Sequence, residues 1–266
     1  MRTSLKWLRR KHAFFTEIYQ SIVGIVRSSK TTSECDHSHS NRFVYLIFNR
    51  FSRLVIIDSS DDESVNKAKV EVEKKLGNNR GLNCLLNNAA VNQNTTLDKI
   101  DEKVMLETYR QNVLGPWRVT KVSVSCRWIQ LHSSFPLDNQ AFQPLVEKAV
   151  TGERNVLQAS IINVSTIMSS STLASNIPLY SYDYQCSKAA LNMYTVCFAT
   201  EMAKSNIFIV LIHPGWVQTD MGGSQAPLTL DQASKNIVQC ITSMKNEHYG
   251  KLIDSTTGSK CSQLPF

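Results

Sequence analysis

Short apolar runs alternate with longer amphipathic segments along most of this chain. Runs of strand length occur at 43–48, 54–57, 82–86, 160–166, 207–212 and 251–253. Segments with apolar residues at helical spacing occur at 61–76, 101–121, 140–149, 183–204 and 230–244. Alternation of buried strands with helices is typical of a parallel sheet covered on both faces. The pattern therefore predicts an α/β fold, a Rossmann-like doubly wound parallel sheet in a three-layer α/β/α arrangement.

Two of the predicted helices carry local signals. For the helix at 61–76 we expect Ser60 as the N-cap, with Glu63 three residues later, and Gly77 at the end. The side chains expected to face inward are Val65, Val70, Val72 and Leu76. In the helix at 101–121, Pro116 is expected to bend the axis and free backbone carbonyls. Its expected apolar stripe consists of Val104, Leu106, Tyr109, Val113 and Leu114.

Residues 122–139 interrupt this helix without a period of their own. If they are removed, the apolar stripe continues from Val119 through Phe142 to Leu145. We interpret 122–139 as an insertion loop. It begins Val-Ser-Val-Ser, which GTAAGT repeats would encode, so a retained intron is one hypothesis for its origin. The predicted organisation is an atypical basic segment at 1–53, partly disordered or degenerate, followed by a domain at 54–266.

The positive charge is confined to the first part of the chain. Residues 1–53 hold ten Lys or Arg and three acids, whereas 54–266 are neutral, which together give the formal net charge of +7. A nucleic-acid role for the domain is therefore not expected. No apolar run reaches the ~18 residues of a membrane span. Residues 1–30, with Glu17 as their only acid, are compatible with a mitochondrial transit peptide as well as with a basic arm.

Cysteine usage indicates a reducing compartment. The seven Cys form an odd set without CxxC spacing, which favours free thiols and a cytoplasmic location, with the mitochondrial one as the alternative. His37 and His39 have no second pair of ligands nearby, so no metal site is predicted.

Polar residues follow three of the apolar runs, at 87–88, 165–166 and 214–219. Carboxyl ends of parallel strands meet at one edge of a sheet, so these residues should line one rim. In the helix at 183–204, Tyr184 and Lys188 are four residues apart and project from one face. A nearby cation lowers the pKa of a tyrosine, which then can act as a general acid or base.

Several motifs in a fixed order carry a family resemblance. They are NNAA at 87–90, QNVLGP at 111–116, IINVST at 161–166, YQCSKAALNM at 184–193, HPGWVQTDMGG at 213–223 and the terminal LPF at 264–266. On these motifs the sequence resembles the short-chain dehydrogenase/reductase family, and within it the C-factor or sniffer-like carbonyl reductase branch. The resemblance covers about residues 54–121 and 140–266.

The resemblance implies reduction of a carbonyl to an alcohol with a nicotinamide cofactor, NADP(H) in preference to NAD(H). Tyr184 would be the proton donor, and Lys188 would lower its pKa and bind the nicotinamide ribose. Asn112 would hold a water that relays protons. Thr166 stands at the position of the family's catalytic serine, where Ser165 or Ser169 are alternatives.

The resemblance also implies a cofactor-binding set. Besides Tyr184 and Lys188, its members are Asp58, Asn88, Ala89, Pro214, Gly215, Val217 and Thr219. Asp58 would lie near the adenine, and Thr219 would reach the nicotinamide amide. Each also has a purely structural reading, in which Asn88 and Thr219 cap turns and Pro214 and Gly215 shape a loop.

The start of the chain departs from the family pattern. The family's glycine-rich turn, TGxxxGxG, lets the backbone approach the cofactor pyrophosphate. Residues 1–76 contain one glycine, Gly24, outside any such pattern, so the first βα unit is expected to be missing or replaced. Two functions follow: an active carbonyl reductase with a small-molecule substrate, or a catalytically silent relative that binds a partner. The family also suggests a homodimer through the helices at 101–149 and 183–204.

Overall fold

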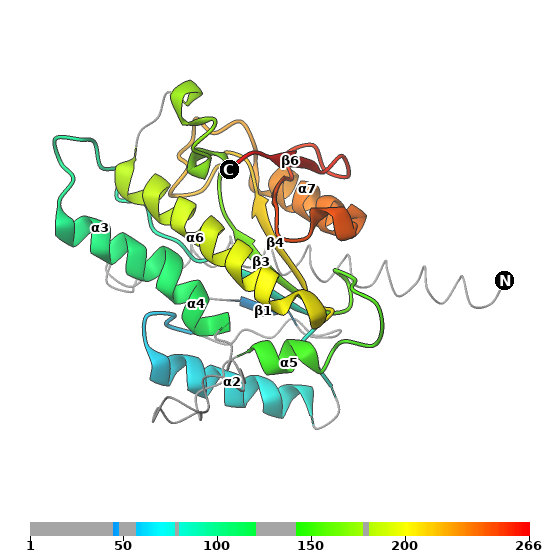
Figure 1. The fold of residues 1–266 in the computed structure, drawn as a ribbon. Helices are drawn as coiled ribbons and strands as arrows, with labels where there is room; N and C mark the ends of the chain where they lie inside the picture. The colour runs from blue at the N-terminus through cyan, green and yellow to red at the C-terminus, as the bar shows by residue number, and fades with distance from the viewer. Residues whose placement is uncertain (1–44, 48–56, 78–79, 121–141, 178–180) are drawn as a thin grey trace.

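A computed structural model describes residues 57–77, 80–120, 142–177 and 181–266, and the backbone of residues 45–47. The described elements form a six-stranded sheet with helices packed against it (Figure 1). The strands are β1 Tyr45–Ile47, β2 Cys84–Asn87, β3 Ser160–Val164, β4 Phe208–His213, β5 Leu252–Asp254 and β6 Ser262–Leu264. They are neighbours in this order, which is also their order along the chain.

The centre of the sheet is parallel and its two edges are antiparallel. Strands β2 to β5 pair in parallel, as predicted. The antiparallel edges were not predicted: β1 pairs with β2, and β6 pairs with β5. Strand β6 is short and its Ser262 and Gln263 are exposed, so no apolar period signals it. At the other edge of the sheet, β1 is antiparallel to β2, whereas the strand of a first βα unit would be parallel to it.

Alternate side chains of the central strands enter two separate apolar clusters. Leu85, Ile161 and Ile209 pack with residues of α2, α5 and α6 on one face. Their neighbours in sequence Leu86, Ile162 and Val210 pack with α7 on the other face. The predicted three-layer α/β/α arrangement is therefore confirmed.

The helices lie close to their predicted ranges. They are α2 Asp62–Leu76, α3 Glu102–Tyr109, α4 Gly115–Thr120, α5 Gln143–Glu147, α6 Tyr182–Glu201 and α7 Leu230–Ser243. Short 3₁₀ turns occur at Ile167–Ser169, Ala174–Asn176, Met202–Lys204 and Asn246–His248. Figure 1 shows α3, α4 and α6 side by side in front of the sheet, in agreement with the packing of α3 on α6. Among the helices of the described ranges, none is both long and apolar enough to cross a membrane.

Helix α2 has a different cap from the expected one. Asp61, not Ser60, is the N-cap, and its carboxylate accepts from the backbone N–H groups of Glu63 and Ser64. Ser60 instead donates its hydroxyl to Asp58. Gly77 ends the helix as predicted. Val65, Val72 and Leu76 are buried, but Val70 is 63% exposed, because Ala68 takes the inward position on that turn.

The segment between α3 and α4 is a π-helical turn, Arg110–Leu114. Pro116 follows it and has no N–H to donate, so it cannot make the usual bond to the carbonyl of Asn112. The expected apolar stripe is largely wrong, since Leu106 and Tyr109 are exposed while Val113 is buried. The side that faces α6 carries Thr108 and Asn112, which are hydrogen-bonded to α6, beside Val113, which packs against Leu191.

Several predictions lie wholly or partly outside the described residues. They concern the basic segment at 1–53 apart from the backbone of β1, most of the strand at 54–57, His37 and His39, and the insertion at 122–139. The described flanks of this insertion meet, because the backbone N–H of Phe142 donates to the carbonyl of Val119 at 3.2 Å. The domain boundaries themselves stay predictions.

Candidate active site

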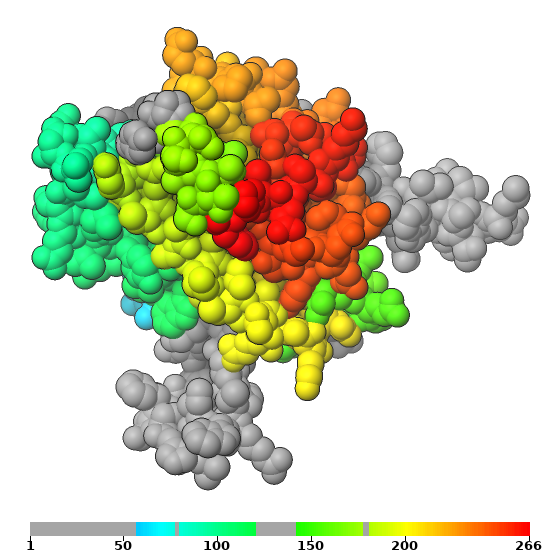
Figure 2. Space-filling model, turned by 45° about the horizontal axis from the view of Figure 1, so that its top comes forward, coloured from blue at the N-terminus to red at the C-terminus, as the bar shows by residue number. Residues whose placement is uncertain are grey.

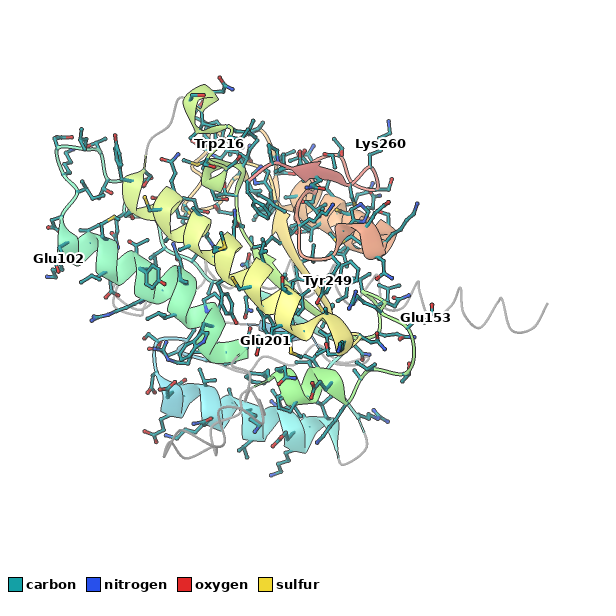
Figure 3. The ribbon with its side chains drawn as sticks, viewed as in Figure 1. Glu102, Glu153, Glu201, Trp216, Tyr249 and Lys260 are labelled. Atoms are coloured by element: carbon teal, nitrogen blue, oxygen red, sulfur yellow. The ribbon has the colours of Figure 1, made fainter. Side chains whose placement is uncertain are left out.

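The start of α6 lies at the carboxyl ends of the central strands. Its residues pack against the 3₁₀ turn that directly follows β3, and Gln185 donates to the carbonyl of Met168 there. Figure 3 shows Trp216, from the loop after β4, on this side of the molecule, whereas Glu201 and Tyr249 lie toward the other end of α6. The predicted rim therefore brings β3, β4 and the tyrosine helix together.

Lys188 is fully enclosed at this rim. Only 2% of its surface is exposed, and its Nζ donates to the carbonyl oxygen of Val164, the last residue of β3, at 2.8 Å. Burial disfavours the charged form and lowers the pKa of the Lys188 amine to about 7. Lys188 therefore exchanges its proton near neutral pH.

Tyr184 lies beside Lys188, whose Nζ is 5.8 Å from the centre of the phenol ring. The predicted lowering of the tyrosine pKa is wrong for this structure, because burial raises the pKa of Tyr184 to about 12. The expected effect of the Lys188 charge on Tyr184 is weakened, because burial disfavours that charge and the Lys188 amine is directed to the carbonyl of Val164. Tyr184 is thus protonated at neutral pH, the state that a proton donor requires.

Thr166 follows β3 with an extended backbone and is 7% exposed. Its hydroxyl oxygen accepts the backbone N–H of Met168 at 3.2 Å. A hydroxyl has one proton to donate in addition, and in the described hydrogen bonds of Thr166 this proton is not used. Thr166 can therefore still donate to a substrate oxygen.

The two alternative hydroxyls are already engaged. Ser165 donates to the side-chain oxygen of Asn192 at 2.6 Å, and Asn192 donates in turn to Ser169 at 2.8 Å. Ser169 donates its own proton to the carbonyl oxygen of Thr166. Since both serines are buried in this network, the geometry favours Thr166 over either of them.

Asn112 is completely buried in the π-helical turn. Its side-chain amide accepts from the N–H of Val91 and donates to the carbonyl of Val91, both at 2.8 Å, and donates to Ser187 Oγ at 2.9 Å. Ser187 in turn donates its hydroxyl proton to the backbone carbonyl of Tyr184. The side chain of Asn112 thus ties the segment after β2 to α6.

Asp183 lies next to Tyr184 in the same site, although no sequence motif indicated it. It is 1% exposed, and its carboxylate accepts hydrogen bonds from Gln93, Thr95, Thr108 and Ser181. Burial alone would raise the pKa of Asp183, but these hydrogen bonds, that from Thr95 foremost, lower it below its ordinary value. The only local signal was an acid in the first turn of a helix, because its other partners are distant in sequence.

The residues expected at the adenosine side lie on two loops. The carboxylate of Asp58 accepts both the N–H and the hydroxyl of Ser60. Asn88 and Ala89 are half-buried directly after β2. Asn87, one residue earlier, donates to Thr120 and Asn163, and its Oδ1 has no partner among the described residues. The structure therefore buries Asn87 as a link within the fold and leaves Asn88 nearer the surface.

The loop after β4 is tightly folded. Gly215 has φ +87°, and a Cβ there would meet Leu228 and Thr256 at less than 3 Å, so this position requires glycine. The hydroxyl of Thr219 accepts the N–H of Gly222 at 3.0 Å, so Thr219 caps a turn. Val217 bridges to Leu228, and the indole of Trp216 donates to Gly222 at 2.7 Å. Pro214, Gly215, Val217 and Thr219 are thus held on one preformed loop beside the rim.

Within the described ranges, no three His, Cys, Asp or Glu residues are grouped as metal ligands would be. His213 ends β4 opposite Asp254 of β5. Burial lowers the pKa of His213 to about 4, although the charge of Asp254 opposes this, and its Nδ1 has no partner among the described residues. His213 is therefore a neutral, buried group.

Comparison with known proteins identifies the class. The sequence profile of the short chain dehydrogenase family matches residues 145–228, which include β3, α6 and β4. The C-signal protein of Myxococcus xanthus is 32% identical over 171 residues, or 64% of this chain and 86% of that protein. The chain therefore belongs to the short-chain dehydrogenase family of oxidoreductases.

Solved structures point to the same branch that the motifs indicated. The NADPH-bound carbonyl reductase from chicken fatty liver matches with a TM-score of 0.68 and 28% identity, over 80% of this chain and 77% of that one. The carbonyl reductase Sniffer of D. melanogaster matches with a TM-score of 0.70 and 25% identity, over 92% and 94%. The resemblance to C-factor and sniffer-like relatives is thus confirmed.

Proposed function

We propose that this chain reduces the carbonyl group of a small molecule to an alcohol, using NADPH in preference to NADH. The observation that carries the proposal is the bond from the buried Lys188 amine to the carbonyl of Val164, since it joins the Tyr184 helix to the strand end that bears Thr166. The carbonyl reductases among its structural relatives, one of them bound to NADPH, support the same direction.

The proposed chemistry assigns one task to each side chain. Thr166 donates a hydrogen bond to the substrate oxygen and orients it. Tyr184, protonated at neutral pH, transfers its proton to that oxygen as negative charge develops there. Lys188, with a pKa of about 7, takes up a proton beside the new phenolate and stabilises it. The bound cofactor supplies the hydride.

The residues present fit the nicotinamide end of such a cofactor. Lys188 has two N–H donors as the neutral amine and three when protonated, and one described acceptor, Val164, so at least one donor is available to ribose hydroxyls in either state. Pro214, Gly215, Val217 and Thr219 form the preformed loop that would flank the nicotinamide. At the other end, Asp58, Asn88 and Ala89 would approach the adenosine.

A second candidate is a silent relative that binds a partner through the same scaffold. Two observations favour it: Gly24 is the only glycine in residues 1–76, and β1 pairs antiparallel with β2. Both concern the region where the family binds the pyrophosphate. The two candidates therefore differ in whether the chain holds a dinucleotide at all.

Cofactor binding decides between them. NADPH and NADH are titrated against the purified chain while the nucleotide fluorescence and the thermal midpoint are recorded. The reductase proposal expects saturable binding, tighter for NADPH. Failure to bind either nucleotide at millimolar concentration would reject this proposal and leave the silent relative.

Substitution of the proton donor tests the chemistry itself. Tyr184→Phe is expected to lower kcat by about 1000-fold with little change in nucleotide affinity, because only the transferred proton is removed. Tyr109→Phe, which removes a phenol from the exposed face of α3, is the matched control and should retain activity. Unchanged turnover in Tyr184→Phe would overturn the assignment.

The exposed apolar side chains of α3, α4 and α6 support a homodimer. Leu106, Tyr109, Trp117 and Met193 are each at least 38% exposed. Covering them with a second copy would remove their apolar surface from water. Sedimentation at micromolar concentration should then give a dimer that Leu106→Glu dissociates. The cytoplasmic location stays an expectation from the cysteine usage.

A further inference from the structure

We infer that Cys240 and Cys261 form an oxidation site, at which a peroxide joins the two thiols in an intramolecular disulfide. The inference does not depend on the proposed function, since both cysteines lie apart from Tyr184 and Lys188. Cys240 belongs to α7 and is completely buried. Cys261 directly precedes β6 and is half-buried.

The two cysteines are in direct contact. The Cys261 thiol donates to the backbone carbonyl of Cys240 at 3.1 Å and is hydrogen-bonded to the Cys240 side chain. Cys261 Sγ also lies 3.1 Å from the hydroxyl of Ser243, one turn further along α7. The thiol of Cys261 therefore lies directly against the turn of α7 that carries Cys240.

The surroundings make Cys261 the reactive thiol and Cys240 the resolving thiol. The hydrogen bond from Cys240 lowers the pKa of Cys261 to about 7, with a further contribution from Ser243 against the opposing effect of burial. The same hydrogen bond and burial raise the pKa of Cys240. The half-buried Cys261 thus provides the thiolate, and the thiolate is the form that reacts with peroxides.

The other described cysteines differ from this pair. Cys84 is buried in the sheet, and burial raises the pKa of its thiol to about 11. Cys186 and Cys197 are exposed on α6, where no second cysteine is in hydrogen-bond contact with either among the described residues. Selective oxidation is therefore expected at Cys261, with Cys240 as its resolving partner.

The reaction balances with hydrogen peroxide as the oxidant. The Cys261 thiolate attacks one peroxide oxygen, the O–O bond breaks, and sulfenic acid and one water form after uptake of a proton. The Cys240 thiol then displaces the hydroxyl of the sulfenic acid as a second water, and the Sγ–Sγ bond forms. Two thiols are oxidised by two electrons, and one peroxide is reduced to two waters.

The bond would join α7 to the β5–β6 hairpin at a place linked to the β4 loop. Asn236 of α7 donates to the carbonyl of Thr256 at 2.7 Å, and the methyl of Thr256 lies against Gly215.

Figure 2 shows the C-terminal residues, in red, at the surface, and Lys260, beside Cys261, projects outward in Figure 3. Peroxide therefore has access from the side of Cys261.

Peptide mapping tests the inference on the full chain. Reduced protein is treated with hydrogen peroxide, its free thiols are alkylated, and trypsin cuts after Lys235, Lys245 and Lys260. The cysteines then lie on separate peptides, 236–245 and 261–266, that only a disulfide can join. The expected product is this linked pair, about 2 Da lighter than the two free peptides, and released by dithiothreitol.

Variants separate this bond from general oxidation. Cys261→Ser should give no linked pair. Cys240→Ser, which keeps a hydrogen-bond donor beside Cys261 but cannot form a disulfide, should leave a sulfenic acid at Cys261 that dimedone traps. Cys197→Ser, which removes an exposed thiol of α6, is the matched control and should form the linked pair as the parent chain does. Absence of the linked pair from the oxidised parent chain, or faster oxidation at Cys197 than at Cys261, would overturn the inference.

The bond should also change thermal stability. Closing a loop of about 20 residues is expected to raise the melting temperature by about 5 °C, and reduction should reverse the shift. The Cys261→Ser variant should show no such shift with peroxide. A peroxide-induced shift of the same size in Cys261→Ser would count against the pair.

Discussion

Helix α6 begins with two buried ionisable residues whose surroundings are opposite. The carboxylate of Asp183 accepts hydrogen bonds from four residues, of which Gln93 and Thr95 belong to the segment after β2. The amine of Lys188 has one described acceptor, the carbonyl of Val164. Both side chains are at most 2% exposed, so the difference lies in their partners and not in their burial.

This difference separates an anchor from a reactive group. Burial penalises the charged form of either residue, but the hydrogen bonds of Asp183 more than offset the penalty and lower its pKa. For Lys188 the penalty is not offset, and its pKa falls to about 7. A buried group satisfied by the protein stabilises the fold, whereas one with unused donors is completed by a ligand. Asp183 therefore fixes the helix end that presents Tyr184.

The largest effect is expected when the anchor is removed. Asp183→Ala leaves the donors of Gln93, Thr95, Thr108 and Ser181 buried without an acceptor, so we expect a loss of about 3–5 kcal/mol in the free energy of unfolding. Urea denaturation measures it. The isosteric Asp183→Asn keeps one acceptor oxygen and should cost less. A loss below about 1 kcal/mol in Asp183→Ala would show that Asp183 is not an anchor.

The sequence predicted one side of this contrast and not the other. Tyr184 and Lys188 share a helix face by their spacing, and the motifs around them identify the family. The role of Asp183 depends on Thr95 and Thr108, which are 88 and 75 residues away, and no local pattern reports such contacts. The same limit applies to the side of α3 that faces α6, where an apolar stripe was expected and Thr108 is hydrogen-bonded to Asp183.

The fold shows the same division between periodic and non-periodic signals. The strands β2 to β5 are buried and apolar, so their existence follows from composition. The antiparallel edges do not, because pairing direction depends on how the chain returns to the sheet. Both Ser60 and Asp61 are good N-cap residues, so the sequence does not decide between them. The backbone angles at Asp61 make it the cap of α2.

The second largest effect is expected at Lys188, whose amine has one described acceptor. Lys188→Met keeps the apolar stem and removes the amine, so we expect the folded state to gain about 1–3 kcal/mol at pH 7 while reductase activity falls. Lys103→Met, an exposed lysine of α3, is the matched control and should change stability little. Stability is measured by urea denaturation and turnover by NADPH oxidation.

The pH dependence of this gain follows from the depressed pKa of Lys188. The folded pKa of about 7 lies below the ordinary value of 10.5, so between these values the unfolded chain binds the additional proton. The penalty is complete below pH 7 and is relieved as the pH rises toward 10.5. The advantage of Lys188→Met should therefore shrink in this window, and a gain that does not change with pH would contradict the assigned cause.

A third, smaller effect is expected in acid and involves His213. Its folded pKa of about 4 lies below the ordinary 6.5, so the unfolded chain gains a proton first and stability falls as the pH drops from 6.5 to 4. His213→Leu should remove about 1–2 kcal/mol of this pH dependence. The lowered pKa of Asp183 acts in the same direction but at lower pH, because its ordinary value is 3.8. Denaturation curves at pH 7, 5.5 and 4.5 distinguish the two, and an unchanged slope in His213→Leu would contradict the role of His213.

The smallest effect is expected for Thr166→Ser, a substitution close to Tyr184 and Lys188 in the site. Thr166→Ser retains the hydroxyl that accepts from Met168 and removes a buried methyl group, so the loss of stability should stay near 1 kcal/mol. The freer χ1 of serine lets the hydroxyl reach the substrate oxygen, and kcat/KM should be kept or raised by up to about threefold. Thr166→Val, which keeps the shape without the hydroxyl, should lower kcat/KM by about 100-fold. If Thr166→Val were as active as the parent chain, the donor to the substrate oxygen would have to be another group, and Thr166 would be only the cap of the turn after β3.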